Sequence, residues 1–217
     1  MPLTFERYSL QRARWPGAGR HILAHFDADT IVVYQAYRPS IGRWAADHGR
    51  FGGDDFSLDR MSWVKPNFLW MMYRSGWGTK EGQEVVLAVR LRRAAFDELL
   101  AAAVHSSHEP AVYGDRREWQ RAVARSDVRL QWDPDHDPSG AKLERRAIQL
   151  GLRGAALANY AEAWIVELTD ISEFVAEQRR VWTSGARDEL VTPREDVYPV
   201  ADPAVAHPCE HQVGALG

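Results

Sequence analysis

Residues 60–80, RMSWVKPNFLWMMYRSGWGTK, place aromatic and cationic side chains close together in the sequence. The segment contains three of the chain's nine tryptophans together with Lys65 and Arg74. A buried element would explain the aromatic residues alone, whereas a binding site would explain both kinds of residue. Rings stack on the rings of a ligand, and cations hold its phosphates. We therefore expect the middle of this segment to be core and its two ends to face a ligand.

Lys65 and Arg74 are the candidate anion-binding residues at those two ends. Pro66 suits the first turn of a helix, so Lys65 is expected at the cap position, where its charge opposes the helix dipole. A lysine beside free backbone N–H groups could bind a phosphate or carboxylate, and the alternative is a side chain that extends into water. Arg74, which follows this expected helix, either caps the final carbonyls or grips a phosphate.

Further polar and aromatic candidates lie on either side of this helix. Tyr73 and Trp77 could stack on a nucleobase or nicotinamide ring, and Ser75 could contact a ribose or amide group. Upstream, VYQAYR (33–38) ends a predicted strand with Gln35 and Tyr37 on one face and Arg38 after them. These side chains would line a pocket, or the Gln35 amide would be satisfied by backbone groups.

The later part of the chain offers weaker candidates. Gln149, Glu162 and Glu167 are expected to be solvated or structural, although one of them could stabilise a transition state if it faces the pocket. The stretch WDPDHDPSG (132–140) resembles a metal site but lacks the pattern of an EF-hand or a zinc site, and we interpret it as a solvated turn. No nucleophile elbow, P-loop or GxGxxG motif is present. The sequence predicts no metal ligand.

Composition limits the function classes. The net charge of −3 argues against wholesale binding to nucleic acid, although a local basic patch is compatible with it. The one cysteine, Cys209, allows no intramolecular disulfide, which fits a reducing compartment. With no signal pattern and no long apolar run, we expect a soluble cytoplasmic protein that does not enter membranes.

The elements that must position these residues alternate irregularly between strands and helices. The expected strands are 30–34, 84–92, 128–132 at a sheet edge, 145–154 (a short helix being the alternative) and 163–170. The expected helices are 40–49 with Ser40 as its cap, the segment from Pro66 to Tyr73, 93–104, 115–125 capped by Asp115, and 171–182 capped by Asp170. We predict an α+β fold: a single compact domain over residues 1–200, with a mixed, mainly antiparallel sheet flanked by helices. Periodicity is lost from about Thr192, and residues 201–217 are expected to be a loose tail.

Four long blocks resemble the family called domain of unknown function 4291. They are TIVVYQAYRPSIG, RMSWVKPNFLWMMYRSGWGTK, QWDPDHDPSGAKLERRAIQLGLRG and WIVELTDISEFV, which lie within residues 12–182. That resemblance carries no activity.

A more distant resemblance is to the ADP-ribosyltransferase-like fold. There an early strand supplies a ribose-holding His or Arg, a Tyr/Ser segment surrounds the nicotinamide, and a late strand supplies Glu or Gln. In this chain IVVYQAYRPSIGRWAADHG and MMYRSGW are similar to the first two parts, and AIQLGLRG or NYAEAWIVEL stands for the third. Gln35 occupies the His/Arg position, and no Gln/Glu-x-Glu pair is present.

The resemblance implies an enzyme that uses NAD to modify an unidentified acceptor, with no metal. Gln35, Tyr73 and Gln149 would then form the catalytic set, and the NAD-binding set would be Tyr37, Arg38, Lys65, Arg74, Ser75 and Trp77. The alternative is a non-catalytic module that binds a nucleotide or nucleic acid, with phosphate contacts from Arg12, Arg14 and Arg20. A third alternative is a structural or partner-binding protein in which Trp63, Trp70 and Trp77 are all buried.

Overall fold

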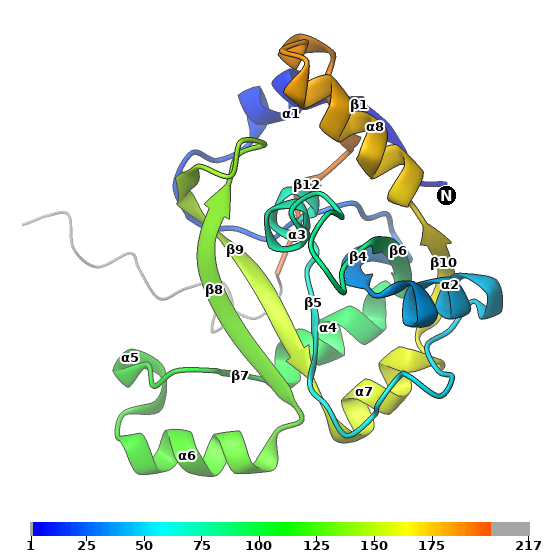
Figure 1. The fold of residues 1–217 in the computed structure, drawn as a ribbon. Coiled ribbons are helices and arrows are strands. Elements are labelled where there is room, and N and C mark those ends of the chain that lie inside the picture. Colours follow the sequence, from blue (N-terminus) through cyan, green and yellow to red (C-terminus); the bar gives the residue numbers. More distant parts are fainter. Residues whose placement is uncertain (1, 201–217) are drawn as a thin grey trace, which may run out of the picture.

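The computed structural model describes residues 2–200, which form an α+β fold of mixed, mainly antiparallel sheets flanked by helices (Figure 1). The strands are β1 (Phe5–Arg7), β2 (Gly19–Arg20), β3 (Leu23–Ala24), β4 (Thr30–Tyr37), β5 (Ser62–Val64), β6 (Val85–Arg92), β7 (Ala103–His105), β8 (Val128–His136), β9 (Lys142–Leu152), β10 (Ile165–Asp170), β11 (Val191–Pro193) and β12 (Asp196–Val197). The helices are α1 (Tyr8–Arg14), α2 (Pro39–His48), α3 (Phe68–Ser75), α4 (Arg93–Ala102), α5 (Pro110–Tyr113), α6 (Arg116–Arg125), α7 (Gly154–Ala161), α8 (Ser172–Thr183) and the 3₁₀ turn Arg187–Glu189. The predicted fold class is confirmed.

An antiparallel sheet in the order β10-β6-β4 is covered on both faces. Val85, Leu87, Val89 and Leu91 of β6 belong to one buried cluster, as their period-two spacing predicts, and Val86 and Ala88 belong to a second cluster on the other face. Because both faces are buried, β4 and β6 are nearly continuous apolar runs. Tyr37, at the end of β4, pairs with Val85.

The second sheet runs in the order β2-β9-β8-β7, and β5 also pairs with β9, at a different part of the strand from β2. Val64 of β5 lies opposite Leu150 of β9. The next residue, Lys65, exchanges two backbone hydrogen bonds with Tyr34 of β4, at 2.7 and 3.2 Å. Lys65 therefore lies where the two sheets meet.

Helix α3 lies near the centre of the molecule, between the long β8–β9 ribbon and strands β4 and β6 (Figure 1). It begins after Asn67, whose side chain accepts a hydrogen bond from the N–H of Trp70, so the prediction that Lys65 caps a helix starting at Pro66 is wrong. Asparagine is a far better cap than lysine, and it determines where the helix begins. Gly76, in the left-handed conformation, ends the helix as expected.

Three other local predictions are corrected. Strand β8 continues to His136 and lies between β7 and β9, so it is neither an edge strand nor followed by a solvated turn at residue 133. Asp135 is buried because it pairs with Arg145 of β9 at 2.6 Å. Helix α2 begins after Arg38 rather than at a Ser40 cap, although Gly49 does end it.

The chain remains ordered in secondary structure beyond Thr192, contrary to expectation. Strands β11 and β12 pair with β1 and β3, and Tyr198 is 2% exposed. These strands are too short to show periodicity. The expected tail at 201–217 lies outside the described residues.

The segment with α5 and α6 stands apart from the rest of the molecule at the lower left of Figure 1. Asp115 caps α6 by accepting hydrogen bonds from the N–H groups of Arg117 and Glu118, as the sequence predicts.

Candidate functional site

A cleft of about 480 Å³ lies where the end of β4, the loop before β5, the residue after β5 and helix α3 meet. It combines the two blocks that the sequence singles out, 33–38 and 60–80. Five of the predicted site residues line it, namely Gln35, Tyr37, Arg38, Lys65 and Arg74.

Four cationic side chains and one carboxylate line this cleft: Arg38, Arg60, Lys65, Arg74 and Asp55. Within residues 2–200, none of the four cations makes a hydrogen bond or an ion pair through its side chain. Many other arginines are paired, for example Arg14 with Glu6 and Arg145 with Asp135. The three cleft arginines are exposed, whereas Lys65 is 5% exposed. The cleft therefore has a cationic rim and a single buried ammonium group.

Lys65 is held in this position by its backbone. The two bonds to Tyr34 fix its main chain between the sheets, so the side chain does not extend into water, which was the alternative expectation. Burial of the ammonium group, reinforced by the nearby charge of Arg74, lowers the pKa of Lys65 to about 8, and Asp133 acts in the opposite direction. A change of ligand charge or of pH near neutrality would therefore alter its protonation.

Gln35 and Tyr37 belong to one hydrogen-bonded chain in the wall of the cleft. The Gln35 amide donates to the Tyr37 hydroxyl at 3.0 Å and to the Trp63 carbonyl at 3.3 Å, and it accepts from the Tyr160 hydroxyl at 2.7 Å. Tyr37 also lies 3.0 Å from the Ser62 hydroxyl. Burial raises the pKa of Tyr37, so its hydroxyl stays protonated at neutral pH. Both N–H groups of Gln35 are thus engaged, and the amide orients Tyr37.

The other four predicted site residues do not line the cleft. Tyr73 is 43% exposed, and its ring stacks on His136 with centroids 3.5 Å apart. Ser75 is fully buried; its hydroxyl donates to the Met71 carbonyl and accepts from the N–H of Gly78, which closes the end of α3. Trp77 packs edge-on against Phe68, with centroids 6.1 Å apart. Adjacent residues on a helix point in different directions, so Arg74 reaches the cleft whereas its neighbours Tyr73 and Ser75 do not.

Gln149 lies next to the cleft rather than in it. Its amide donates to one Asp133 oxygen at 2.7 Å, and the Gln131 amide donates to the other at 2.8 Å. Since Asp133 acts on the charge of Lys65, Gln149 is linked to the cleft through one carboxylate. Glu162 and Glu167 form ion pairs with Arg50 and Arg90.

Sequence reasoning misses residues 55–57, which form one side of the cleft, and assigns no role to Arg60 beside them. Arg60 supplies a fourth cation there, and Phe56 and Trp63 supply half-buried aromatic surface. The loop has no periodicity that would place it. Arg60 at the start of the aromatic block was the one signal available.

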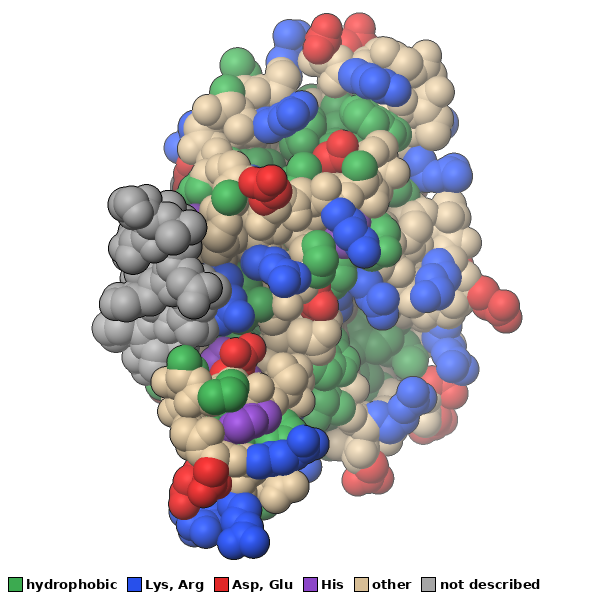
Figure 2. All heavy atoms as spheres, turned by 90° about the vertical axis from the view of Figure 1, so that its left-hand side faces the viewer, with side chains coloured by type: hydrophobic (Ala, Val, Ile, Leu, Met, Phe, Trp, Pro, Cys, Tyr) green, Lys and Arg blue, Asp and Glu red, His purple; other side chains and the backbone are tan. Residues whose placement is uncertain are grey.

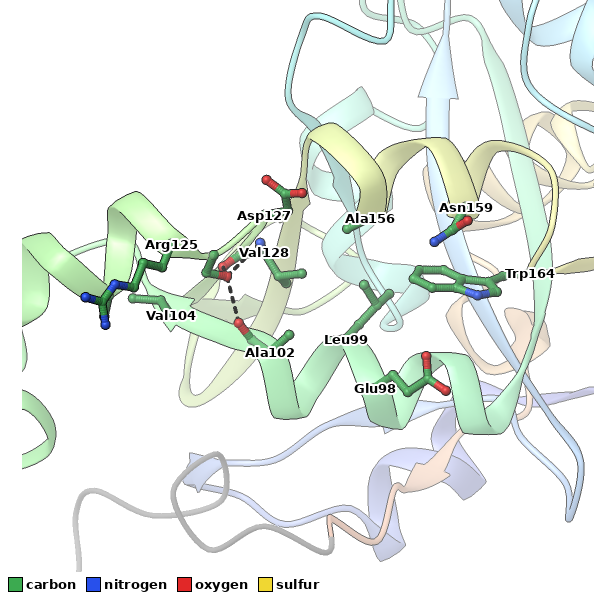
Figure 3. Close-up of a pocket in the computed structure, with 12 residues that line it drawn as sticks. Glu98, Leu99, Ala102, Val104, Arg125, Asp127, Val128, Ala156, Asn159 and Trp164 are labelled. Carbon is green, nitrogen blue, oxygen red and sulfur yellow. Dashed lines mark hydrogen bonds between the residues drawn. The ribbon is translucent and has the colours of Figure 1, made fainter.

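A second cavity of about 550 Å³ lies between α4, α6, α7 and the start of β8 (Figure 3). Leu99 and Trp164 contribute much of its wall. Two of its polar groups are already engaged: Ser126 bonds with Ala102 and Val128, and Asp127 lies 3.6 Å from the Arg153 guanidinium. Figure 3 shows Arg125 extending away from the apolar side chains. The charged side chains that line this cavity are Glu98, Asp127 and Arg125, so it lacks the excess of cations found in the cleft.

Two of the three N-terminal arginines that could contact phosphates are already paired. Arg14 pairs with Glu6 and Asp196, and Arg20 lies 3.7 Å from Glu109. On the face shown in Figure 2, acidic side chains lie between the basic ones, so the part of that face described here has no continuous basic stripe. The same residues 2–200 contain no cluster of three or more His, Cys, Asp or Glu side chains suited to a metal ion. Nor does any helix in this range have the length and apolar character needed to cross a membrane.

A protein-family model matches this chain. The model of the family described as Domain of unknown function (DUF4291) matches residues 21–198, which is most of the sequence. The chain belongs to this family. The DUF4291 match includes every residue that lines the cleft, so the cleft lies wholly within the family's region. No curated protein matches the chain.

Proposed function

We propose that the cleft binds a nucleotide-like small molecule that carries phosphate groups. The supporting observation is the set of four cations in one cleft, unpaired within the described residues, of which Lys65 is buried. A buried cation without a partner is costly for a folded protein, and an anionic ligand supplies the missing partner. Tyr37, Phe56 and Trp63 provide aromatic surface beside these charges, where a base can stack.

Calorimetric titration with ADP, ADP-ribose and adenosine tests this proposal. ADP and ADP-ribose are expected to bind, and adenosine, which lacks phosphate, is expected to bind far more weakly. Lys65→Met and Arg74→Ala should each weaken ADP binding by roughly 10- to 100-fold, which corresponds to one charge-assisted hydrogen bond. Lys80→Ala, at an exposed lysine outside the cleft, is the matched control. Equal affinity in all four proteins would remove the cleft from consideration.

A second candidate is NAD-dependent transfer of ADP-ribose to an acceptor, which could be a nucleic acid. It is favoured by the meeting of Gln35, Tyr37 and Arg38 with Lys65 and Arg74 in one cleft. Breaking the nicotinamide–ribose bond requires stacking, phosphate contacts and a polar group near the ribose. Phe56 or Trp63 would supply the stacking here, because Tyr73 and Trp77 lie elsewhere. Gln149 would act only through Asp133.

Release of nicotinamide from NAD distinguishes these candidates. Release that is lost in Lys65→Met and Arg74→Ala supports the transferase, whereas binding of NAD without release supports the binding module. If short single-stranded RNA binds with a steep salt dependence and nucleotides do not, the ligand is nucleic acid rather than a small molecule.

A further inference from the structure

Lysine is rare in this protein, and its positions are informative. The chain has three lysines, Lys65, Lys80 and Lys142, among its 27 basic residues. Lys80 and Lys142 are exposed, and Lys65 is buried in the cleft. The two residue types differ chemically, because an arginine remains protonated whereas a lysine can become a neutral amine that attacks carbon.

The surroundings of Lys65 are those that activate an amine. It is only 5% exposed, it has no hydrogen-bond or ion-pair partner for its side chain within residues 2–200, and Arg74 places a second positive charge nearby. Desolvation and an adjacent cation both favour the neutral form, which is the nucleophile. Asp133 opposes this effect, but both of its oxygens also accept hydrogen bonds from the Gln131 and Gln149 amides, which reduces their availability to Lys65.

The rim supplies what a reactive amine needs in order to select a substrate. Arg38, Arg60 and Arg74 are free to hold a phosphate at the mouth of the cleft, above the buried amine. A ligand with a phosphate at one end and a carbonyl group at the other would thus be anchored by the arginines and presented to Lys65.

We propose that Lys65 is a covalent site, at which the cleft forms an imine with the aldehyde or ketone of a phosphorylated small molecule. This inference rests on the proposed function, since phosphate binding in the cleft positions the carbonyl. Lys65 first loses a proton to solvent, and the neutral Nζ then adds to the carbonyl carbon. The carbonyl oxygen leaves as water, and a C=N bond remains.

Pyridoxal 5′-phosphate, an aldehyde that carries a phosphate, is the probe. The protein is incubated with it at pH 8, borohydride then delivers a hydride to reduce each imine to a stable secondary amine, and peptide mapping locates the labels. Lys65 is expected to be labelled about tenfold faster than Lys80 or Lys142, because a much larger fraction of it is the neutral amine at this pH. The exposed lysines are internal controls that require no mutation.

Two related compounds separate this inference from the proposed function. Pyridoxine 5′-phosphate has the phosphate but no aldehyde and reports binding alone, and pyridoxal has the aldehyde but no phosphate. If pyridoxine 5′-phosphate binds and Lys65 is labelled no faster than the exposed lysines, the covalent site is wrong and phosphate binding stands. If pyridoxine 5′-phosphate does not bind but pyridoxal labels Lys65 selectively, the reactive amine stands and the phosphate site is wrong.

Variants complete the test. Lys65→Arg keeps the charge but cannot form an imine, so it should still bind pyridoxine 5′-phosphate and lose the label in the peptide that contains residue 65. Lys80→Arg should keep both the binding and the label on Lys65. Arg74→Ala should reduce the preference for pyridoxal 5′-phosphate over pyridoxal several-fold. An unchanged preference in Arg74→Ala would overturn the assigned role of the rim. Thermal melting checks that each variant is folded. If Lys65→Arg is not folded, the labelling rates of the three lysines in the unmutated protein still test whether Lys65 is the covalent site.

Discussion

Burial of the Lys65 ammonium group opposes folding. The unfolded chain leaves this group in water with its ordinary pKa of 10.5, and the folded chain lowers the pKa to about 8. Between these two pH values the unfolded state binds more protons, so the free energy of unfolding rises with pH in that window. Below about pH 8, a range that includes neutral pH, burial of the charged ammonium group lowers the free energy of unfolding by its full amount.

Replacement of Lys65 by methionine should therefore stabilise the protein in the absence of ligand. Methionine fills a similar volume without charge, and we expect the free energy of unfolding at pH 7 to rise by about 1–3 kcal/mol. Thermal melting should show an increase of roughly 2–4 °C for each kcal/mol. The same variant should lose affinity for ADP. A destabilised Lys65→Met with full ADP affinity would show that the lysine is a structural residue.

Anion binding in the cleft should depend on pH through the same group. ADP is almost fully ionised from pH 7.5 to 9.5, so its own charge changes little across this range. Tyr37 does not ionise there, because burial raises its pKa above the ordinary value of 10.0. Loss of the Lys65 proton is then the relevant change, and ADP affinity should fall by about tenfold or more across this range. Lys65→Arg is the control, in which the affinity should stay level.

At the scale of elements, helix α3 is fixed by a residue that comes from the far end of the chain. Glu195 is 1% exposed, and its two carboxyl oxygens accept from the Phe68 N–H at 2.6 Å and from the Asn67 amide at 3.1 Å. These contacts satisfy groups at the N-terminus of the helix that carries Arg74 into the cleft. Burial raises the pKa of Glu195 well above its ordinary value of 4.5.

Removal of the Glu195 side chain should destabilise the protein more than its neutralisation does. Glu195→Ala leaves the buried Phe68 N–H without an acceptor, and we expect a loss of about 2–4 kcal/mol in urea unfolding. Glu195→Gln keeps an acceptor for the Phe68 N–H but turns an NH2 group toward the Asn67 amide, so its loss should be smaller, about 1–2 kcal/mol near pH 7. It should also lack the decrease in stability that a raised carboxyl pKa causes as pH increases. Equal losses in both variants would mean that the charge, rather than the acceptor, holds the helix.

At the scale of the whole molecule, one buried ion pair connects the β8–β9 ribbon to the distant N-terminal segment. Arg145 of β9 pairs with Asp135 of β8 at 2.6 Å and also donates to the Pro16 carbonyl at 2.7 Å. Its guanidinium carbon lies 5.3 Å from the centre of the Trp15 ring. The N-terminal segment is thereby attached to the β8–β9 ribbon.

Arg145→Met should cost about 3–5 kcal/mol of stability at pH 7, because it leaves the Asp135 carboxylate buried without a partner. Burial already raises the pKa of Asp135, and loss of the arginine should raise it further. The deficit should therefore shrink as the pH falls and the carboxyl becomes neutral. Urea unfolding at pH 7 and pH 5 measures this, with Asp135→Asn/Arg145→Met as the comparison that removes both charges. A deficit independent of pH would assign the loss to packing.

The sequence predicts the elements better than their meeting points. Period-two spacing in β6 and the glycines at 49 and 76 depend on local physics, and they appear in the structure as expected. The position of Lys65 could not be predicted in this way. Its backbone pairs with Tyr34, which lies 31 positions earlier in the printed sequence, and no local pattern reveals that pairing. Tyr73 and Trp77 are assigned to the site by their position in the chain alone; helix geometry directs Tyr73 away from the cleft, and Trp77, beyond the end of the helix, packs against Phe68.

The Tyr34–Lys65 backbone pair also couples the relative motion of the two sheets to the position of Lys65. Two backbone hydrogen bonds tie β4 to the segment that follows β5, so the sheets can tilt relative to each other at this point only if those bonds break or Lys65 moves with them. The width of the cleft therefore depends on how long these two hydrogen bonds remain intact. Slow deuterium exchange at the Lys65 amide without ligand would indicate a rigid, preformed cleft. Exchange that slows only when a ligand is added would indicate a cleft that closes on the ligand.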